Sequence, residues 1–294
     1  MSGSSADSSG RNESVTPPQL KMPPALIERA RALVGVPGAE STLPEVWTPP
    51  VPRDAATVVL VRDGEAGIEV FVQRRVKTMA FAAGMYVFPG GAVEDEDRKA
   101  AAHLANTKLA SEVSSLTSIV VDGEIGADTL AARIAAVRET EEEAGFRFHD
   151  PEALQYIAHW ITPEVEERRF DTRFYAAAIS DSTELVDIEG ESDRSLWISP
   201  ADALAQYAAR EMAMLPPTVA TLGAFAAAAA KGLSAQQCVD ELGAVKVVPL
   251  LPSAVADPAA DAGISWVILN AVTGETLVAM GGAPAGSESR GINP

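Results

Sequence analysis

The chain has 294 residues, one cysteine, and 41 acidic against 23 basic side chains, which gives a net charge of −18. One cysteine excludes an internal disulfide framework, and the negative charge argues against sequence-independent nucleic-acid binding, which needs a positive surface. The sequence has no run of about twenty apolar residues and no apolar signal region near its start, so we expect neither a transmembrane helix nor secretion. We therefore expect a cytoplasmic protein that binds neither nucleic acid nor a membrane.

The N-terminal part predicts a polar tail, an arm and a first hairpin. Residues 1 to about 22 are polar and Ser-rich, a composition typical of disorder. Further on, two β-branched apolar runs flank the turn sequence D-G-E-A-G, which is typical of a β-hairpin. In chain order, we expect a helix at 24–33, a Pro-rich connection at 37–52, hairpin strands at 56–61 and 69–73, and a strand at 85–88.

The central part predicts an insertion followed by a long helix. The insertion, residues 98–126, begins as a helix at 100–109. The long helix is expected to open at Thr129, because the Asp128 carboxylate can accept the free N–H groups of the first turn. Gly145 is a candidate for the position that ends it.

The remainder of the chain predicts a second hairpin, two helices and a strand-rich end. Proline is favoured in the first turn of a helix, so Ser199-Pro200 marks the start of the first helix. We expect hairpin strands at 154–161 and 170–179, closed by 197–198, helices at 200–211 and 219–233, a strand at 245–251, and a terminal hairpin at 264–269 and 276–279.

Three carboxylates share one face of the long helix. Glu139, Glu142 and Glu143 are spaced i, i+3 and i+4, and Arg138 lies four residues before Glu142, within reach of a carboxylate. Carboxylates crowded in this way repel each other, and Mg²⁺ or Mn²⁺ would relieve the repulsion because hard cations take carboxylate oxygens. The alternative is an ordinary solvated acidic face, which is the commoner meaning of a charge run.

The order of residue types favours the metal site. R-E-T-E-E-E-A-G-F at 138–146 resembles R-E-U-x-E-E-x-G-U, the second half of the Nudix box, where U is aliphatic and Thr140 is a departure. The first half, G-x5-E, is similar to Gly91 followed six residues later by Asp97. The acid and the arginine are 138 − 97 = 41 residues apart, so an insertion splits the box.

The split box resembles that of the peroxisomal coenzyme A diphosphatase type of Nudix protein. The resemblance is carried by V-F-P-G-G-A-V-E-D-E-D-R, W-I-T-P, R-F-D-T-R-F and L-P-P-T, and it covers about Ala55 to Ala230. The arginine of the usual coenzyme A signature is replaced by Ala80. The resemblance therefore suggests coenzyme A as the substrate, although the coenzyme A signature itself is not present.

The resemblance implies a fold and a domain organisation. The fold is an α/β (α+β) Nudix α/β/α sandwich, with a mixed β-sheet between helices, an insertion within the box and terminal extensions. The expected divisions are a disordered tail and N-terminal arm at 1–50, a hydrolase domain at 51–235 with its insertion at about 98–127, and a C-terminal extension at 236–294.

The resemblance also implies a metal site for Mg²⁺ or Mn²⁺. Glu142 and Glu143 would be the principal ligands, and Glu139 a ligand or the base that takes a proton from water. Gly91 would contribute its carbonyl, which a glycine turn brings close to the metal. Arg138 would orient the carboxylates, with Asp97 as its partner.

A catalytic base and phosphate-binding cations complete the expected site. Glu191 is the candidate base from a distant loop, with Glu166 and Glu164 as alternatives. Arginine can hold a phosphate with two donors at once, and the candidates for substrate binding are Arg74, Arg75 and Arg169.

These residues imply a divalent-metal-dependent pyrophosphohydrolase. Its substrate would be a nucleoside diphosphate linked to another group, such as coenzyme A or an acyl-coenzyme A. The alternative is a catalytically silent Nudix-fold protein that binds a nucleotide or has a regulatory role. The complete set of glutamates, Glu139, Glu142 and Glu143, argues against this alternative. The insertion and the C-terminal extension are candidates for the contacts of a homodimer.

Overall fold

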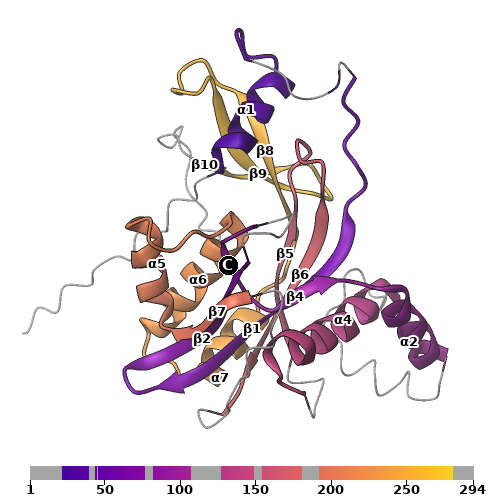
Figure 1. Cartoon of the computed structure of the whole chain (residues 1–294), viewed down its shortest axis with the longest axis vertical. Helices are drawn as coiled ribbons and strands as arrows, with labels where there is room; N and C mark the ends of the chain where they lie inside the picture. The colour runs from indigo at the N-terminus through magenta and orange to yellow at the C-terminus, as the bar shows by residue number, and fades with distance from the viewer. Residues whose placement is uncertain are drawn as a thin grey trace, which may run out of the picture.

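The structure is a computed structural model, and it describes residues 22–39, 44, 46–76, 82–106, 127–148, 154–180 and 192–280. Within these ranges the strands form one mixed sheet that is flanked by helices on both sides (Figure 1). The helices are α1 (Pro24–Leu33), α2 (Asp95–Asn106), α4 (Ala127–Ala144), α5 (Pro200–Ala208), α6 (Pro216–Ala229) and α7 (Ala235–Gly243).

The sheet follows the order β10-β9-β8-β5-β6-β1-β2-β3, with β4 paired to β1 and β7 paired to β2. The β1–β6 and β5–β8 pairs are parallel, and the other pairs are antiparallel. The strands are β1 (Arg53–Gly64), β2 (Gly67–Arg75), β3 (Tyr86–Val87), β4 (Gly90–Ala92), β5 (Gln155–Ile161), β6 (Phe170–Ala178), β7 (Ser192–Ile198), β8 (Pro249–Ala256), β9 (Ile264–Asn270) and β10 (Thr276–Met280).

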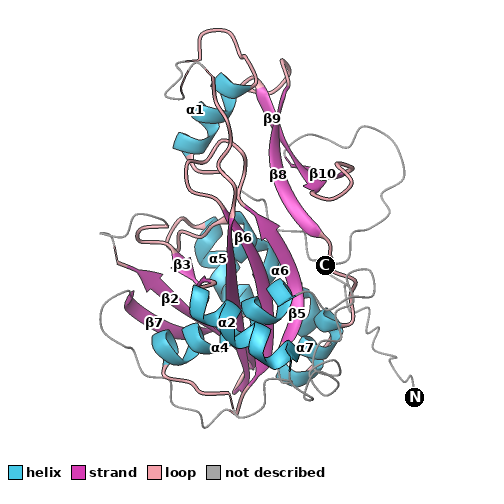
Figure 2. Cartoon of the chain, turned by 90° about the vertical axis from the view of Figure 1, so that its right-hand side faces the viewer, coloured by secondary structure: helices cyan, strands magenta, loops and turns pink. Residues whose placement is uncertain are grey.

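Side chains of β1 alternate between two hydrophobic cores. Val59 and Val61 join the core that contains buried residues of α5, α6 and α7. Val58 and Leu60 join the opposite core, which α4 covers with alanines. A strand buried on both faces reads as a continuous apolar run, as T-V-V-L-V does here. Figure 2 shows the helices on both sides of the strands, and the predicted α/β/α sandwich is confirmed.

A third cluster joins the N-terminal arm to the far end of the sheet. Leu26 and Ala30 of α1 pack with Ile264 and Trp266 of β9. The loop between β5 and β6 joins this cluster through Val165, which is also buried. The arm is therefore fastened to both β9 and the β5–β6 loop.

Several sequence predictions are confirmed. Helix α1 spans the predicted residues 24–33, and all three predicted hairpins are present, as β1–β2, β5–β6 and β9–β10. Ser199 caps α5, because its hydroxyl accepts the N–H group of Asp202. No helix in the described part of the chain is long and apolar enough to cross a membrane.

Several local predictions are wrong. Helix α6 spans 216–229 instead of the predicted 219–233, and β8 spans 249–256 instead of the predicted 245–251. Helix α4 already begins at Ala127, so Asp128 lies in its first turn and accepts a bond from Arg98 Nη1 at 3.1 Å. Residues 197–198 do not close the second hairpin, because β7 pairs with β2, where Trp197 lies opposite Phe71. Helix α2 begins at Asp95, five residues before the predicted start.

Helix α7 is an element that the sequence analysis missed. Ser234 and Gln237 form a capping box, a signature that is readable in the sequence as S-x-x-Q. Although α7 lies in the range predicted to be a C-terminal extension, Cys238 and Val239 are fully buried in the same core as α6. The described part of that range therefore contributes to the main core.

Candidate active site

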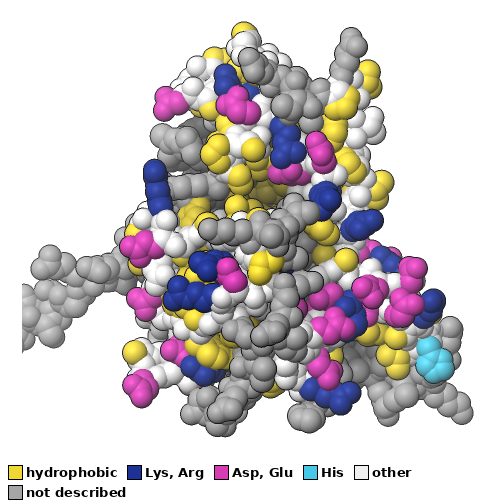
Figure 3. All heavy atoms as spheres, in the orientation of Figure 1, with side chains coloured by type: hydrophobic (Ala, Val, Ile, Leu, Met, Phe, Trp, Pro, Cys, Tyr) yellow, Lys and Arg dark blue, Asp and Glu magenta, His cyan; other side chains and the backbone are white. Residues whose placement is uncertain are grey.

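Helix α4 separates a buried alanine face from an acidic face. Ala132, Ala135 and Ala136 are buried against the sheet, while the acidic residues lie on the remaining surface. Figure 3 shows acidic side chains gathered over α4 and α2. The helix ends at Gly145, which has a positive φ of 66° and donates its N–H to Glu141 O, as the sequence predicted.

Thr140, which departs from the aliphatic residue of the motif that 138–146 resembles, is fully buried on α4. Its hydroxyl donates to Ala136 O at 2.8 Å, one turn earlier in the same helix. This bond satisfies the polar group inside the core, so the departure from the usual residue needs no other partner.

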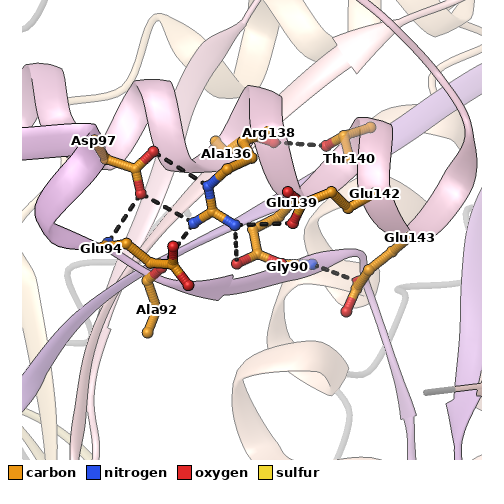
Figure 4. Close-up of polar contacts among 10 residues, drawn as sticks. All are labelled: Gly90, Ala92, Glu94, Asp97, Ala136, Arg138, Glu139, Thr140, Glu142 and Glu143. Carbon is orange, nitrogen blue, oxygen red and sulfur yellow. Dashed lines mark hydrogen bonds and ion pairs between the residues drawn. The ribbon is translucent and has the colours of Figure 1, made fainter. Parts of the chain in front are cut away.

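Arg138 lies at the centre of the polar contacts on α4 (Figure 4). Its Nη1 donates to Glu139 Oε1 and to Glu142 Oε2, each at 2.9 Å. Its Nε and Nη2 donate to the two oxygens of Asp97 at 3.2 and 2.9 Å, and Nη2 also donates to Ala92 O at 3.1 Å. One guanidinium group therefore contacts three carboxylates and a backbone carbonyl.

Asp97 is nearly inaccessible, with 3% of its side chain exposed. Besides Arg138, it accepts the backbone N–H of Glu94 at 2.9 Å, just before α2 begins. The bond to Asp97 is the leading cause that raises the pKa of Arg138 above its usual value, so the guanidinium stays charged. The fold therefore brings together the two motif halves, which lie 41 residues apart.

Glu143 points to a different pair of donors. Its Oε2 accepts Gln73 Nε2 at 2.6 Å and the backbone N–H of Gly90 at 2.9 Å. The sequence analysis did not identify Gln73. A signal was available, because Gln73 lies two residues after Phe71 on the same face of the strand and directly follows the apolar run V-F-V.

Two adjacent glycines bring β4 close to its neighbours for different reasons. A Cβ atom on Gly91 would lie 2.2 Å from Glu139 Oε1, at the end of a flexible side chain. A Cβ atom on Gly90 would lie 2.4 Å from Ala56 O and 2.6 Å from Thr57 Cα, which belong to the backbone of β1. Gly91 therefore makes room for the Glu139 carboxylate, whereas Gly90 makes room for a strand.

We expect Gly91→Ala to impair activity more than stability. The added methyl group must displace the Glu139 carboxylate, and a misplacement of about 1 Å in a catalytic constellation can lower the rate on the order of 100-fold. Gly90→Ala should also lower the melting temperature, because its methyl group clashes with the backbone of β1. Thermal melts and hydrolysis rates of both variants test this difference, and an equally large loss of stability in Gly91→Ala would contradict it.

The candidate substrate-binding arginines lie in different environments. Arg74 and Arg75 follow Gln73 at the end of β2, and Arg74 Nε donates to Asp193 Oδ1 at 2.7 Å. That bond is the leading cause that raises the pKa of Arg74. Arg169 is buried, and it donates to Thr162 O at 3.0 Å and to Pro50 O at 2.9 Å. Its burial lowers its pKa from the usual value.

The candidate bases are only partly described. Glu191 lies outside the described residues. Glu166 forms an ion pair with Arg29 of α1 at 2.9 Å, and Glu164 accepts Trp47 Nε1 through its backbone carbonyl at 2.8 Å. The described alternatives to Glu191 therefore lie in a loop that the N-terminal arm contacts.

The oxygen donors of these carboxylates fit a hard cation, but the described side chains are not grouped around one point. Within the described ranges, no group of three or more His, Cys, Asp or Glu is arranged to hold a metal ion. Arg138 lies between Glu139 and Glu142, and Glu143 is bonded to Gln73 and Gly90. The donor type still fits Mg²⁺ or Mn²⁺, because oxygen ligands beside a glycine turn are what these ions take.

The chain is similar in part to solved Nudix structures. A Nudix hydrolase from Alicyclobacillus acidocaldarius is 27% identical over 59% of this chain and 90% of its own, with a TM-score of 0.47. An Ap4A hydrolase from C. elegans is 17% identical over 60% of this chain and 98% of its own, with a TM-score of 0.35. The NUDIX domain of Shewanella oneidensis NrtR, complexed with ADP ribose, is 11% identical over 59% of this chain and 85% of its own, with a TM-score of 0.39. No protein-family model matches the chain.

Proposed function

We propose that this protein is a divalent-metal-dependent pyrophosphohydrolase of the Nudix type. The observation that carries the proposal is the contact of Arg138 with Asp97 of one motif half and with Glu139 and Glu142 of the other. An ordinary solvated acidic face would not need a nearly buried partner carboxylate from another helix. The proposed substrate is a nucleoside diphosphate linked to another group.

The carboxylates have separate parts in the proposed reaction. A bound Mg²⁺ or Mn²⁺ would neutralise the diphosphate and make hydroxide available near neutral pH. Glu142, whose side chain is 57% exposed, and Glu143 would hold the ion. Glu139, which is 14% exposed and lies against Gly91, would act as a ligand or take the proton of the attacking water.

Arg138 keeps these groups in place. Because Nη1 contacts both Glu139 and Glu142, the two carboxylates are oriented by one rigid planar group. Positioning and charge stabilisation supply most of the catalysis in phosphoryl transfer, so a fixed carboxylate frame matters more than acid–base strength. Glu191 remains our proposed base from a distant loop.

The substrate's phosphates are proposed to meet arginines at the end of β2. Arg74 and Arg75 directly follow Gln73, which itself contacts Glu143. A phosphate at this strand end would compete with Asp193 for Arg74. Arg169 remains a third candidate, although two backbone carbonyls accept its donors.

Coenzyme A or an acyl-coenzyme A is the proposed substrate to test first. The support is the resemblance of the split box and its flanking stretches, and Ala80 at the signature arginine weakens that support.

We also propose a hydrolase domain at 51–235, a cytoplasmic location and a homodimer. Size-exclusion chromatography with light scattering would test the homodimer directly.

A substrate panel tests the function. The panel contains coenzyme A, acetyl-coenzyme A, NADH, ADP-ribose, a diadenosine polyphosphate and a nucleoside triphosphate. We expect at least one of these compounds to be hydrolysed with Mg²⁺ or Mn²⁺, and none to be hydrolysed with EDTA. Release of 3′,5′-ADP from coenzyme A would support the closer resemblance. Hydrolysis of another compound alone would keep the reaction and reject coenzyme A. No turnover would favour the catalytically silent, nucleotide-binding alternative.

A further inference from the structure

We propose that Gln73 is a positioning residue that fixes the Glu143 carboxylate for a divalent cation and thereby sets the protein's affinity for that cation. This inference rests on the proposed function, because it assigns Gln73 to the same metal site. It concerns a residue outside both motif halves, on a strand instead of the acidic helix.

The contact between Gln73 and Glu143 is short and reinforced. Gln73 Nε2 and the backbone N–H of Gly90 both donate to Glu143 Oε2, at 2.6 and 2.9 Å. Two donors from different strands fix both the position and the rotation of the carboxylate. The three partners come from β2, β4 and α4, so the contact also ties the acidic helix to the glycine turn.

The backbone of Gln73 is rigid. It lies in β2 between two antiparallel neighbours, with Val87 of β3 opposite on one side and Ser195 of β7 on the other. The residue is 2% exposed, so surrounding atoms restrict the rotamers of its side chain. A hydrogen-bond donor held in this way can orient a carboxylate on a helix that would otherwise move among rotamers.

The orientation of the Gln73 amide follows from its partner. A flipped amide would place its oxygen against Glu143 Oε2, and two acceptors cannot form a hydrogen bond. In the described orientation, Gln73 Oε1 is buried and has no hydrogen-bond partner among the described residues. A buried acceptor without a hydrogen bond lowers stability. Stability alone would therefore favour an apolar residue at position 73, like Phe71 two positions earlier on the same face.

A neutral donor suits a metal ligand better than a cationic one. Arg138 orients Glu139 and Glu142 but also offsets their negative charge. Gln73 orients Glu143 through a neutral amide, so this contact itself adds no positive charge beside the carboxylate. Because the carboxylate is already ordered, less conformational entropy is lost when an ion binds, and affinity rises.

The test measures Mn²⁺ binding without substrate, by the electron paramagnetic resonance signal of free Mn²⁺ in titrations of the full chain at pH 8. We expect Gln73→Leu to weaken binding by about 10- to 100-fold, the range typical of residues that orient metal ligands. Gln73→Met, which has a similar length but no amide donor, should weaken it by a similar factor. If Gln73→Leu does not fold, Gln73→Met provides the measurement.

Thr221→Val is the matched control. Thr221 is a buried polar residue on α6, and its hydroxyl also has no partner within the described ranges. The substitution removes a buried polar group that does not belong to the acidic face of α4, so the affinity for Mn²⁺ should stay unchanged. Thermal melts of all variants separate a loss of folding from a loss of affinity.

Kinetics supply a second readout. Gln73→Leu should raise the Mg²⁺ concentration needed for half-maximal hydrolysis, while kcat at saturating Mg²⁺ changes much less. Wild-type Mn²⁺ affinity in both Gln73 variants would overturn the positioning role and leave the proposed function standing. A wild-type protein that neither binds Mn²⁺ nor hydrolyses any substrate would overturn the proposed function, and the positioning role with it.

Discussion

Glu142→Gln is expected to lower metal-dependent hydrolysis by about a thousandfold while the fold remains intact. A metal ion contributes several kcal/mol of charge stabilisation, and loss of about 4 kcal/mol lowers the rate about a thousandfold. Glu142 is 57% exposed and bonds to Arg138 at 2.9 Å. An exposed ion pair contributes at most about 1 kcal/mol, so stability should change little. Steady-state kinetics at saturating Mg²⁺ and a thermal melt measure both effects.

Glu141→Gln is the matched control for this variant. Glu141 carries the same group one residue earlier on α4, is exposed, and lies 3.5 Å from Arg147 instead of Arg138. Its substitution should leave kcat within about twofold, because the ligand charge at Glu142 is retained. If Glu142→Gln kept most of the wild-type activity, the assignment of the metal site to this face of α4 would be wrong.

The second large effect is expected for Arg138→Met, which should lower both stability and activity. Removal of one partner from a buried ion pair costs about 3–5 kcal/mol, because the other charge is left without compensation. Here the remaining charge is Asp97, whose side chain is 3% exposed. A loss of about 3 kcal/mol would lower the melting temperature by roughly 6–12 °C. Hydrolysis should fall as well, since Glu139 and Glu142 lose the group that orients them.

A double-mutant cycle distinguishes this pair from general damage. Adding Asp97→Asn to Arg138→Met removes the uncompensated charge, so the double variant should be less destabilised than the sum of the single variants. Arg31→Met is the control, since Arg31 forms an ion pair with Glu28 on the surface of α1 at 3.1 Å and should contribute at most about 1 kcal/mol. Additive losses in the Arg138 and Asp97 variants would show that the pair does not couple the two motif halves.

Most of the fold could be predicted because its signals are local. A turn between β-branched runs specifies a hairpin, and the apolar run of β1 indicates a strand buried on both faces. The boundaries were less accurate at α2, α4, α6 and β8, because propensity changes gradually at the ends of helices and strands. The capping box of α7 was readable but was overlooked.

Part of the candidate site could also be predicted from spacing. Glu139, Glu142 and Glu143 necessarily share one helix face, and the proximity of Arg138 to Glu142 follows from four-residue spacing. The Asp97 partner was expected from the motif, and the structure contains that contact across 41 residues. Gln73 was not found, because its role depends on a helix 70 residues further along the chain.

The sequence by itself determined most of the elements and the acidic helix face, because helical and strand periodicities are local properties of the chain. The tertiary structure alone decided that β7 pairs with β2, that α7 packs beside α6, and that Gln73 and Gly90 converge on Glu143. The physical reason is that these contacts join segments far apart in sequence. Whether two such segments meet depends on sheet order and packing of the whole core, which no local pattern encodes.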